Sequence, residues 1–212
     1  MYGKIDNPDT GKGAYKEDYP TLAVSPTFRR EKLIDIWNKN YELNPSMFCL
    51  LNGAFFTDKP EPIELSFPLK QNGVIISTGG GEKEYPGTDE KKMLEICEEQ
   101  LNITDLSPEA LFSSSAPDII AGLDEKVNKN TLNSICRTFI GINDKNGDGE
   151  FEILLIFSSQ YATQLHAADT LRSFGATKVM MLDGGGSTQL ICQGESFISS
   201  TRTIPQSLAI IS

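Results

Sequence analysis

The sequence has little positive charge and no long apolar run, and each shortage excludes a class of protein. Nineteen lysine and arginine residues stand against 29 aspartate and glutamate residues, which gives a formal net charge of −10. This balance argues against nucleic-acid binding as the main task, because such binders usually carry a basic patch. No run of eighteen apolar residues occurs, so we predict no membrane span.

Histidine is almost absent, and serine lacks the context of a hydrolase nucleophile. His166 is the single histidine, so a Ser-His-Asp triad would have to use it. No GxSxG nucleophile elbow is present, which argues against that triad. We interpret His166 as an exposed helix residue, with a role in lining a substrate site as the alternative.

Cysteine is sparse, and its spacing excludes the common zinc motifs. Cys49, Cys97, Cys136 and Cys192 lie far apart and form no CxxC pair. They are either buried thiols or the partners of one or two disulfides. Because three of them lie among apolar residues, we favour buried thiols.

The remaining composition is that of an ordinary globular chain, with 39% hydrophobic and 23% charged residues. Its 212 residues are enough for one domain with a full core. Residues 1–24 are rich in Gly, Pro, Asp and Lys, so we expect an N-terminal loop or flap, followed by one domain over residues 25–212. The first fifteen residues contain no apolar signal-peptide core, so an export signal would lie outside this chain.

Short apolar runs and turn signals predict an α+β fold with mixed or mostly antiparallel sheets and a few packed helices. The runs Met47–Leu51, Ile135–Ile142 and Phe151–Phe157 are typical of strands. Helices are expected from Ser25-Pro26 to about Asn40 and from Tyr161 to Phe174. We expect Leu165, Ala168, Leu171 and Phe174 on the buried side of the second helix.

Two segments are ambiguous. Glu90–Leu101 combines a helix-like Lys and Glu content with strand-like alternation, and the pattern does not decide between them. Residues 144–149, DKNGDG, imitate the start of a calcium loop. The twelfth position of that loop should be Glu but is Leu155, so we interpret the segment as a hairpin turn.

The segment around which the chain is organised is Lys178–Leu190, KVMMLDGGGSTQL. A short apolar strand ends at Asp183, which places a carboxylate at the carboxyl end of a strand, where open sheets commonly bind ligands. The glycines permit positive φ and close approach of a ligand, and their N–H groups can form an anion site. A plain glycine-rich turn is the alternative. The candidate residues are Asp183, Gly184, Gly185, Gly186, Ser187 and Thr188.

Two arginines and one amide are further candidates. Arg137 lies within a predicted strand, and Arg202 precedes a proline turn. Both can be plain surface arginines, but guanidinium groups hold phosphate well through paired hydrogen bonds. Asn52-Gly53 is either a simple turn or an amide directed at a sugar hydroxyl.

Four motifs occur in a recognisable order: NGAFF at 52–56, RTFIGI at 137–142, MLDGGGSTQL at 181–190 and TRTIPQSLAI at 201–210. From about Arg29 to the C-terminus the chain resembles the phosphodiester glycosidase family, and bacterial, cyanobacterial-type members in particular. The family includes the mammalian uncovering enzyme, which removes N-acetylglucosamine from a phosphate on mannose. Many members have an acidic-Gly-Arg triplet where this chain has Ser158-Ser159-Gln160.

The resemblance implies hydrolysis of a sugar-1-phosphodiester at its glycosidic bond, in an extracytoplasmic setting and on envelope or exopolysaccharide glycans. We expect no cofactor, and the sequence leaves open whether a bound ion helps the glycine-rich loop. The resemblance carries functional weight onto the residues already singled out: Asn52, Gly53, Arg137, Gly184–Thr188, Asp183 and Arg202. In this hypothesis Asp183 acts on the sugar, and Arg137 and Arg202 hold the phosphate across a shared cavity.

The second carboxylate and the reaction class stay open at this point. Asp118, Asp144 and Asp169 are possible partners of Asp183. A non-catalytic module that binds a phosphorylated glycan is one alternative, favoured by the Ser158–Gln160 departure. A metal-dependent phosphodiesterase is another, although the sequence lacks a His/Asp metal cluster.

Overall fold

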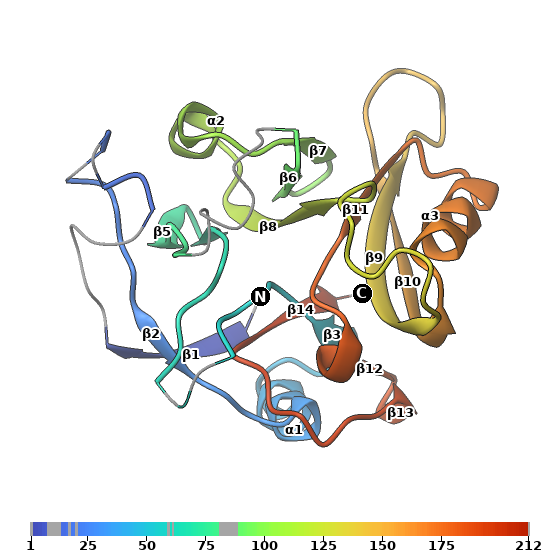
Figure 1. Cartoon of the computed structure of the whole chain (residues 1–212), viewed down its shortest axis with the longest axis horizontal. Helices are drawn as coiled ribbons and strands as arrows, with labels where there is room; N and C mark the ends of the chain where they lie inside the picture. The colour runs from blue at the N-terminus through green and yellow to red at the C-terminus, as the bar shows by residue number, and fades with distance from the viewer. Residues whose placement is uncertain are drawn as a thin grey trace.

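A computed structural model shows two antiparallel sheets with helices on their outer faces (Figure 1). It describes residues 2–7, 14–16, 18–19, 21–58, 60, 62–80 and 89–211. The predicted α+β class is confirmed, because strands outnumber helices and every described strand pair is antiparallel. In the described part of the chain, the helices are too short and too polar to cross a membrane.

The smaller sheet has six strands in the order β13-β12-β3-β14-β1-β2. They are β1 Tyr2–Asn7, β2 Thr27–Arg29, β3 Met47–Asn52, β12 Leu190–Cys192, β13 Glu195–Ile198 and β14 Gln206–Ile211.

The larger sheet follows the order β10-β9-β11-β8-β4-β5, and β6 joins it by pairing with β8 and β7. Its strands are β4 Leu69–Gln71, β5 Val74–Ser77, β6 Lys91–Ile96, β7 Leu101–Asp105, β8 Asp118–Asp124, β9 Ile135–Asn143, β10 Ile153–Ala162 and β11 Lys178–Met181. The helices are α1 Leu33–Leu43, α2 Pro108–Ser113 and α3 Gln164–Ser173.

Apolar side chains alternate between two faces along the central strands, and this builds four layers. In β3, Leu51 belongs to the core between the sheets, while Leu50 packs with α1 on the outer face. In β9, Ile140 faces the core between the sheets, while Phe139 packs on the side of α3. Since successive side chains of a strand point to opposite faces, continuous apolar runs are what a sheet covered on both faces requires.

The helices close the two outer faces. On the smaller sheet, α1 buries Leu33, Ile36 and Trp37 against β3 and β12. On the larger sheet, α3 lies against β9 and β10 and contributes Ala168 and Leu171 to the outer core (Figure 1).

The first 45 residues differ most from prediction. Tyr2–Asn7 form strand β1, which pairs with β14 and β2, so the expected loop is wrong there. Met1 and residues 8–13, 17 and 20 lie outside the described residues, and the division of the chain at residue 25 stays a prediction. The helix expected from Ser25 begins only at Leu33, because Phe28 lies in a strand and is buried between the sheets.

Two further elements depend on tertiary packing. The ambiguous Glu90–Leu101 segment contains strand β6, whose Met93 and Leu94 are buried on opposite faces. Helix α3 is present, but its buried residues are Gln164, Ala167, Ala168 and Leu171, while Leu165 and Phe174 are exposed. The expected buried face was therefore wrong in part, because a polar residue, Gln164, begins the buried stripe.

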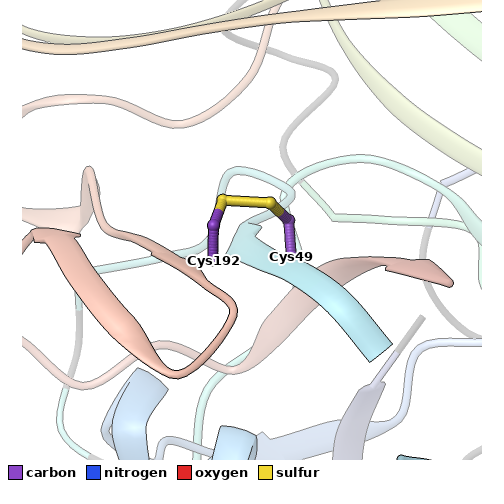
Figure 2. Close-up of a disulfide and its surroundings, with 2 residues drawn as sticks. All are labelled: Cys49 and Cys192. Carbon is purple, nitrogen blue, oxygen red and sulfur yellow. A yellow bond between two sulfur atoms is a disulfide. The ribbon is translucent and has the colours of Figure 1, made fainter. Parts of the chain in front are cut away.

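One disulfide joins neighbouring strands of the smaller sheet. Cys49 on β3 lies directly opposite Cys192 on β12, and their sulfur atoms are 2.05 Å apart (Figure 2). Cys97 and Cys136 are free thiols and partly buried. The preference for buried thiols was therefore wrong for the pair that meets across the sheet, whose partners lie 143 residues apart in sequence.

Candidate functional site

The glycine-rich segment connects the two sheets. It leaves the larger sheet after β11 at Asp183 and enters the smaller sheet as β12 at Leu190. The Asp183 N–H donates to the carbonyl of Gly53 at 3.2 Å, just beyond β3. The site therefore lies where the ends of β3 and β11 meet.

Asn52 fixes this junction with its amide. Its Nδ2 donates to the main-chain carbonyl of Asp183 at 2.6 Å, and its Oδ1 accepts from Thr138 Oγ1 at 2.9 Å and Gln189 N at 3.1 Å. The side chain is 1% exposed, and it does not line the cavity described below. The structure therefore gives Asn52 a positioning role, in contrast to the expected contact with a sugar.

Close packing explains why residue 53 is a glycine. A Cβ at this position would lie 1.7 Å from Oε1 of Gln206. That oxygen accepts from Ala54 N at 2.8 Å, so it cannot move away without losing a buried hydrogen bond. Glycine is required here by close approach rather than by a ligand.

The turn after Asp183 leaves two N–H groups available. Gly184 N donates to Asp183 Oδ1 at 2.9 Å, and Ser187 N and Thr188 N donate within the turn. Gly185 has φ of +59°, and the N–H groups of Gly185 and Gly186 have no hydrogen-bond partner among the described residues. Ser187 and Thr188 are buried, whereas the three glycines at the start of the turn are half-buried or exposed. Free amides of this kind can bind an anion.

A cavity of about 290 Å³ lies in front of this turn. Apolar and aromatic side chains form much of its wall, and Asp183 is the only carboxylate among the described residues that line it. Its lining includes Phe55, Phe56, Ser66, Phe67, Lys129, Asn130, Ile135, Arg137, Thr138, Phe139, Met181, Leu182, Asp183, Gly184 and Gly185.

The carboxyl group of Asp183 titrates well above its ordinary range. Loss of water on burial raises its pKa to about 6, although the Ser187 hydroxyl and the Gly184 N–H stabilise the charged form. The positive charges of Arg202 and Lys129 also lower this pKa and so limit the rise. A carboxylate that is poised near neutrality in a cavity is typical of a group that acts as a base or nucleophile.

Arg202 packs against the glycine-rich turn and against Phe56, but it does not line the cavity, in contrast to the expectation that it shares the cavity with Asp183. Its guanidinium lies 5.1 Å from the centre of the Phe56 ring and forms an ion pair with Asp58 at 3.1 Å. A Cβ at Gly186 would lie 3.2 Å from its Cδ, so the glycine lets the arginine pack closely. The buried Nε has no hydrogen-bond partner among the described residues.

Arg137 does line the cavity, but its guanidinium is directed at the main chain. It donates to the carbonyls of Lys129 at 2.6 Å and Asn130 at 2.7 Å, and to those of Asn133 and Ala162 at 3.4 Å. The side chain is 2% exposed, and burial lowers its pKa from the ordinary arginine value. These contacts contrast with the prediction that Arg137 itself holds phosphate.

The remaining polar candidates lie away from the cavity. His166 is on the exposed side of α3, with its ring edge-on to Phe157 at 6.1 Å, and it does not line the cavity. Asp118 caps the turn at Asn72, and Asp169 is exposed beside Arg172 on α3. Neither is placed to act with Asp183.

The calcium-like segment forms the hairpin turn between β9 and β10, as predicted. Oxygen atoms of Asp144, Asp148 and Glu152 lie within 4.8 Å of one another, and this is the one such acidic group in the described part of the chain. Asp144 accepts hydrogen bonds from the N–H groups of Gly147 and Gly149, and these lower its pKa. The turn's own hydrogen bonds account for the cluster.

Sequence reasoning missed Lys129. It lies in the polar loop between β8 and β9, where a lysine ordinarily indicates a solvated surface. In the structure its Nζ lies 5.6 Å from the centre of the Phe55 ring, and its charge acts on Asp183. No local pattern marks it, because the loop is brought to the cavity by packing against α3 and β9.

Comparison with known proteins decides the family. The phosphodiester glycosidase family matches residues 48–211, which include all four motifs and the cavity around Asp183. The chain belongs to this family. Residues 48–211 therefore form a phosphodiester glycosidase-like domain. No curated protein sequence matches the chain.

Two solved structures share the fold of this family member. The catalytic domain of zebrafish N-acetylglucosamine-1-phosphodiester alpha-N-acetylglucosaminidase, auto-inhibited by its pro-peptide, aligns with a TM-score of 0.61 at 14% identity. That alignment covers 87% of this chain and 68% of the zebrafish chain. A hypothetical protein from Synechocystis aligns with a TM-score of 0.52 at 12% identity, over 95% of this chain and 55% of its own.

Proposed function

We propose that this protein hydrolyses the glycosidic bond of a sugar-1-phosphodiester of the N-acetylglucosamine type. The observation that carries the proposal is the placement of Asp183. Its carboxylate has a pKa of about 6 and lines a cavity at the start of a turn, where two N–H groups have no partner among the described residues. Family membership supports a phosphodiester-linked sugar as the substrate class.

One carboxylate is sufficient for this chemistry because of the leaving group. A phosphodiester departs as a stable anion, so the reaction needs little help from a general acid. The protein must stabilise positive charge on the sugar and negative charge on the departing phosphate. The cavity offers Asp183 for the first task and the N–H group of Gly185 for the second. Gly186 lies beside the cavity on the same glycine-rich turn, and Arg202 packs against it.

Asp183 acts in this proposal as a nucleophile or as the base that activates water. Either role requires the ionised carboxylate. Because the pKa of Asp183 is about 6, this form predominates at pH values above about 6. The aromatic walls formed by Phe55, Phe56 and Phe67 suit the apolar faces of a sugar ring. Asn52 and Gly53 position Asp183, because the Asn52 amide and the Gly53 carbonyl form hydrogen bonds with its main chain.

Product analysis with UDP-N-acetylglucosamine tests the proposal. Cleavage of the C–O bond releases free N-acetylglucosamine and UDP, and this is the expected result. Cleavage of the pyrophosphate bond releases N-acetylglucosamine 1-phosphate and UMP, and would instead identify a phosphodiesterase. Binding in a calorimeter with no released sugar would identify a non-catalytic glycan-binding module.

The Ser158–Gln160 departure does not weaken the catalytic proposal. These residues lie on β10, where Ser159 is paired with Arg137. None of the three lines the cavity. The departure therefore lies beside the site, next to Arg137, and not among the groups proposed for catalysis.

The pH dependence of turnover follows from Asp183. Because the active form is the carboxylate, kcat/KM should rise with pH and level off above an apparent pKa of about 6. Initial rates between about pH 4.5 and 8 at constant ionic strength measure this profile. A rate that does not change across this range would exclude Asp183 as the base or nucleophile.

The proposed setting is extracytoplasmic, with envelope or exopolysaccharide glycans as the substrate. The Cys49–Cys192 disulfide supports this location, because such bonds persist mainly in oxidising compartments. The net charge of −10 suits a glycan with a single local phosphodiester charge better than a long polyanion.

A further inference from the structure

We infer that Lys129 is the phosphate-binding cation inside the cavity, and that Gln164 and Arg137 are positioning residues that hold it there. This inference rests on the proposed function, because it names the residue that recognises the phosphodiester of the substrate. It also reassigns Arg137, whose guanidinium is occupied by the main chain rather than by a ligand.

Both main-chain polar groups of Lys129 are held by buried side chains. Its N–H donates to Oε1 of Gln164 at 3.3 Å. Its carbonyl accepts from Nη1 of Arg137 at 2.6 Å. Loop residues usually bond to water or to their own turn, so two buried side chains on one lysine backbone indicate a position that must be fixed.

Gln164 holds the first part of the loop from the start of α3. Its Nε2 donates to the carbonyls of Glu125 and Val127, the latter at 2.6 Å. Its own N–H donates to the carbonyl of Thr131 at 3.3 Å. The side chain is 1% exposed and begins the buried stripe of α3, where an apolar residue would ordinarily stand.

Arg137 holds the second part of the loop from strand β9. After the carbonyl of Lys129, its guanidinium bonds the carbonyls of Asn130 and Asn133. Asn130 has φ of +58°, a left-handed conformation that needs support from its surroundings. The loop is therefore fixed on both sides at the point where Lys129 and Asn130 line the cavity.

The position of Lys129 suits the phosphate anion that leaves from a sugar bound beside Asp183. The lysine and the aspartate line the same cavity, and the lysine charge lowers the pKa of Asp183. The ammonium also lies 5.6 Å from the centre of the Phe55 ring, at the aromatic wall proposed for the sugar. A cation in partly dry surroundings binds phosphate more strongly than one on an open surface.

Titration with inorganic phosphate tests Lys129 directly and needs no turnover. Lys129→Met should weaken phosphate binding by roughly tenfold or more, and Lys129→Arg should retain most of it, since a bond to a charged group is lost in the first and kept in the second. Lys126→Met is the matched control, because Lys126 is an exposed lysine of the same loop outside the cavity. Lys129→Met should also raise the pKa of Asp183, measured by carboxyl NMR, while Lys126→Met should not.

These measurements separate the two proposals. If the protein releases no sugar from UDP-N-acetylglucosamine, the hydrolase proposal fails, and the phosphate titration still decides the role of Lys129. If Lys129→Met and Lys126→Met bind phosphate equally well, the inference is overturned, whether or not the wild-type protein is a hydrolase.

A double variant tests the positioning role of Gln164. Gln164→Met keeps the volume of the side chain but removes its hydrogen bonds to the loop. It should weaken phosphate binding less than Lys129→Met, and the double variant should bind no more weakly than Lys129→Met alone. Additive losses would show that Gln164 acts independently of Lys129. If Gln164→Met does not fold, Arg137→Lys offers the same test, because it keeps the charge but loses the bonds to several carbonyls.

Discussion

Replacing Asp183 with asparagine is expected to remove nearly all turnover and, at the same time, to stabilise the folded protein at neutral pH. Asparagine has the shape of the acid but cannot serve as a base or nucleophile, so kcat should fall by roughly a thousandfold or more. Release of N-acetylglucosamine from UDP-N-acetylglucosamine measures this loss.

The gain in stability follows from the raised pKa of Asp183. Burial raises this pKa from 3.8 to about 6, because the buried site disfavours the ionised carboxylate. At neutral pH the folded protein therefore holds an ionised group in an unfavourable environment. The folded state binds more protons than the unfolded state between these two values, so this group destabilises the fold progressively as pH rises through that window. At pH 7 the difference corresponds to about 1–3 kcal/mol, and the neutral asparagine removes it.

The pH dependence of the stability difference between Asp183→Asn and the wild-type protein is the control for this explanation. Denaturant unfolding of both proteins should show the asparagine variant more stable at pH 7, and the difference should shrink as the pH falls toward about 3, where Asp183 is mostly protonated in both states. A variant that is inactive but no more stable at pH 7 would argue against a strongly raised pKa. A variant with normal rates would remove Asp183 from the mechanism.

Loss of the Cys49–Cys192 disulfide is expected to lower stability by about 3–5 kcal/mol. The bond closes a loop of 143 residues, and a long loop greatly restricts the unfolded chain. It also joins β3 to β12, the strands on either side of the site, since β3 leads to Asn52 and β12 follows the glycine-rich turn. The double serine variant should therefore unfold at a clearly lower denaturant concentration.

The other two cysteines provide a matched control. Cys97 and Cys136 are free and partly buried, so replacing both with serine removes two thiols without opening a loop. That variant should lose much less stability than Cys49→Ser with Cys192→Ser. Equal losses in the two double variants would show that the crosslink itself contributes little.

Local sequence determined those parts of the protein in which short-range patterns and final environment agree. The apolar runs of β3, β9 and β10 lie in two sheets that are covered on their outer faces by helices, and the Asn72-Gly73 turn joins β4 to β5. The placement of Asp183 at the end of a strand followed from the same pattern, since a run of buried residues ends where a charge and three glycines begin.

Tertiary structure decided which polar groups are available to a ligand. Nothing in the sequence favoured one of three polar candidates for ligand binding: Asn52, Arg137 and Arg202. In the folded protein the side chains of Asn52 and Arg137 bond main-chain atoms. Asn52 and Asp183 lie far apart along the chain, so no local pattern reveals their hydrogen bond.

The same reason explains the residues that were placed wrongly or overlooked. Gln164 looked like a polar residue at the start of a helix, but it is buried because three loop residues supply its hydrogen bonds. Lys129 looked like a surface lysine, but the same bonds bring it into the cavity. The sequence by itself determined several central strands, the family and the position of Asp183 at the end of a strand. Only the folded chain decided which cation faces that acid, because hydrogen bonding between distant segments sets the position of each charge.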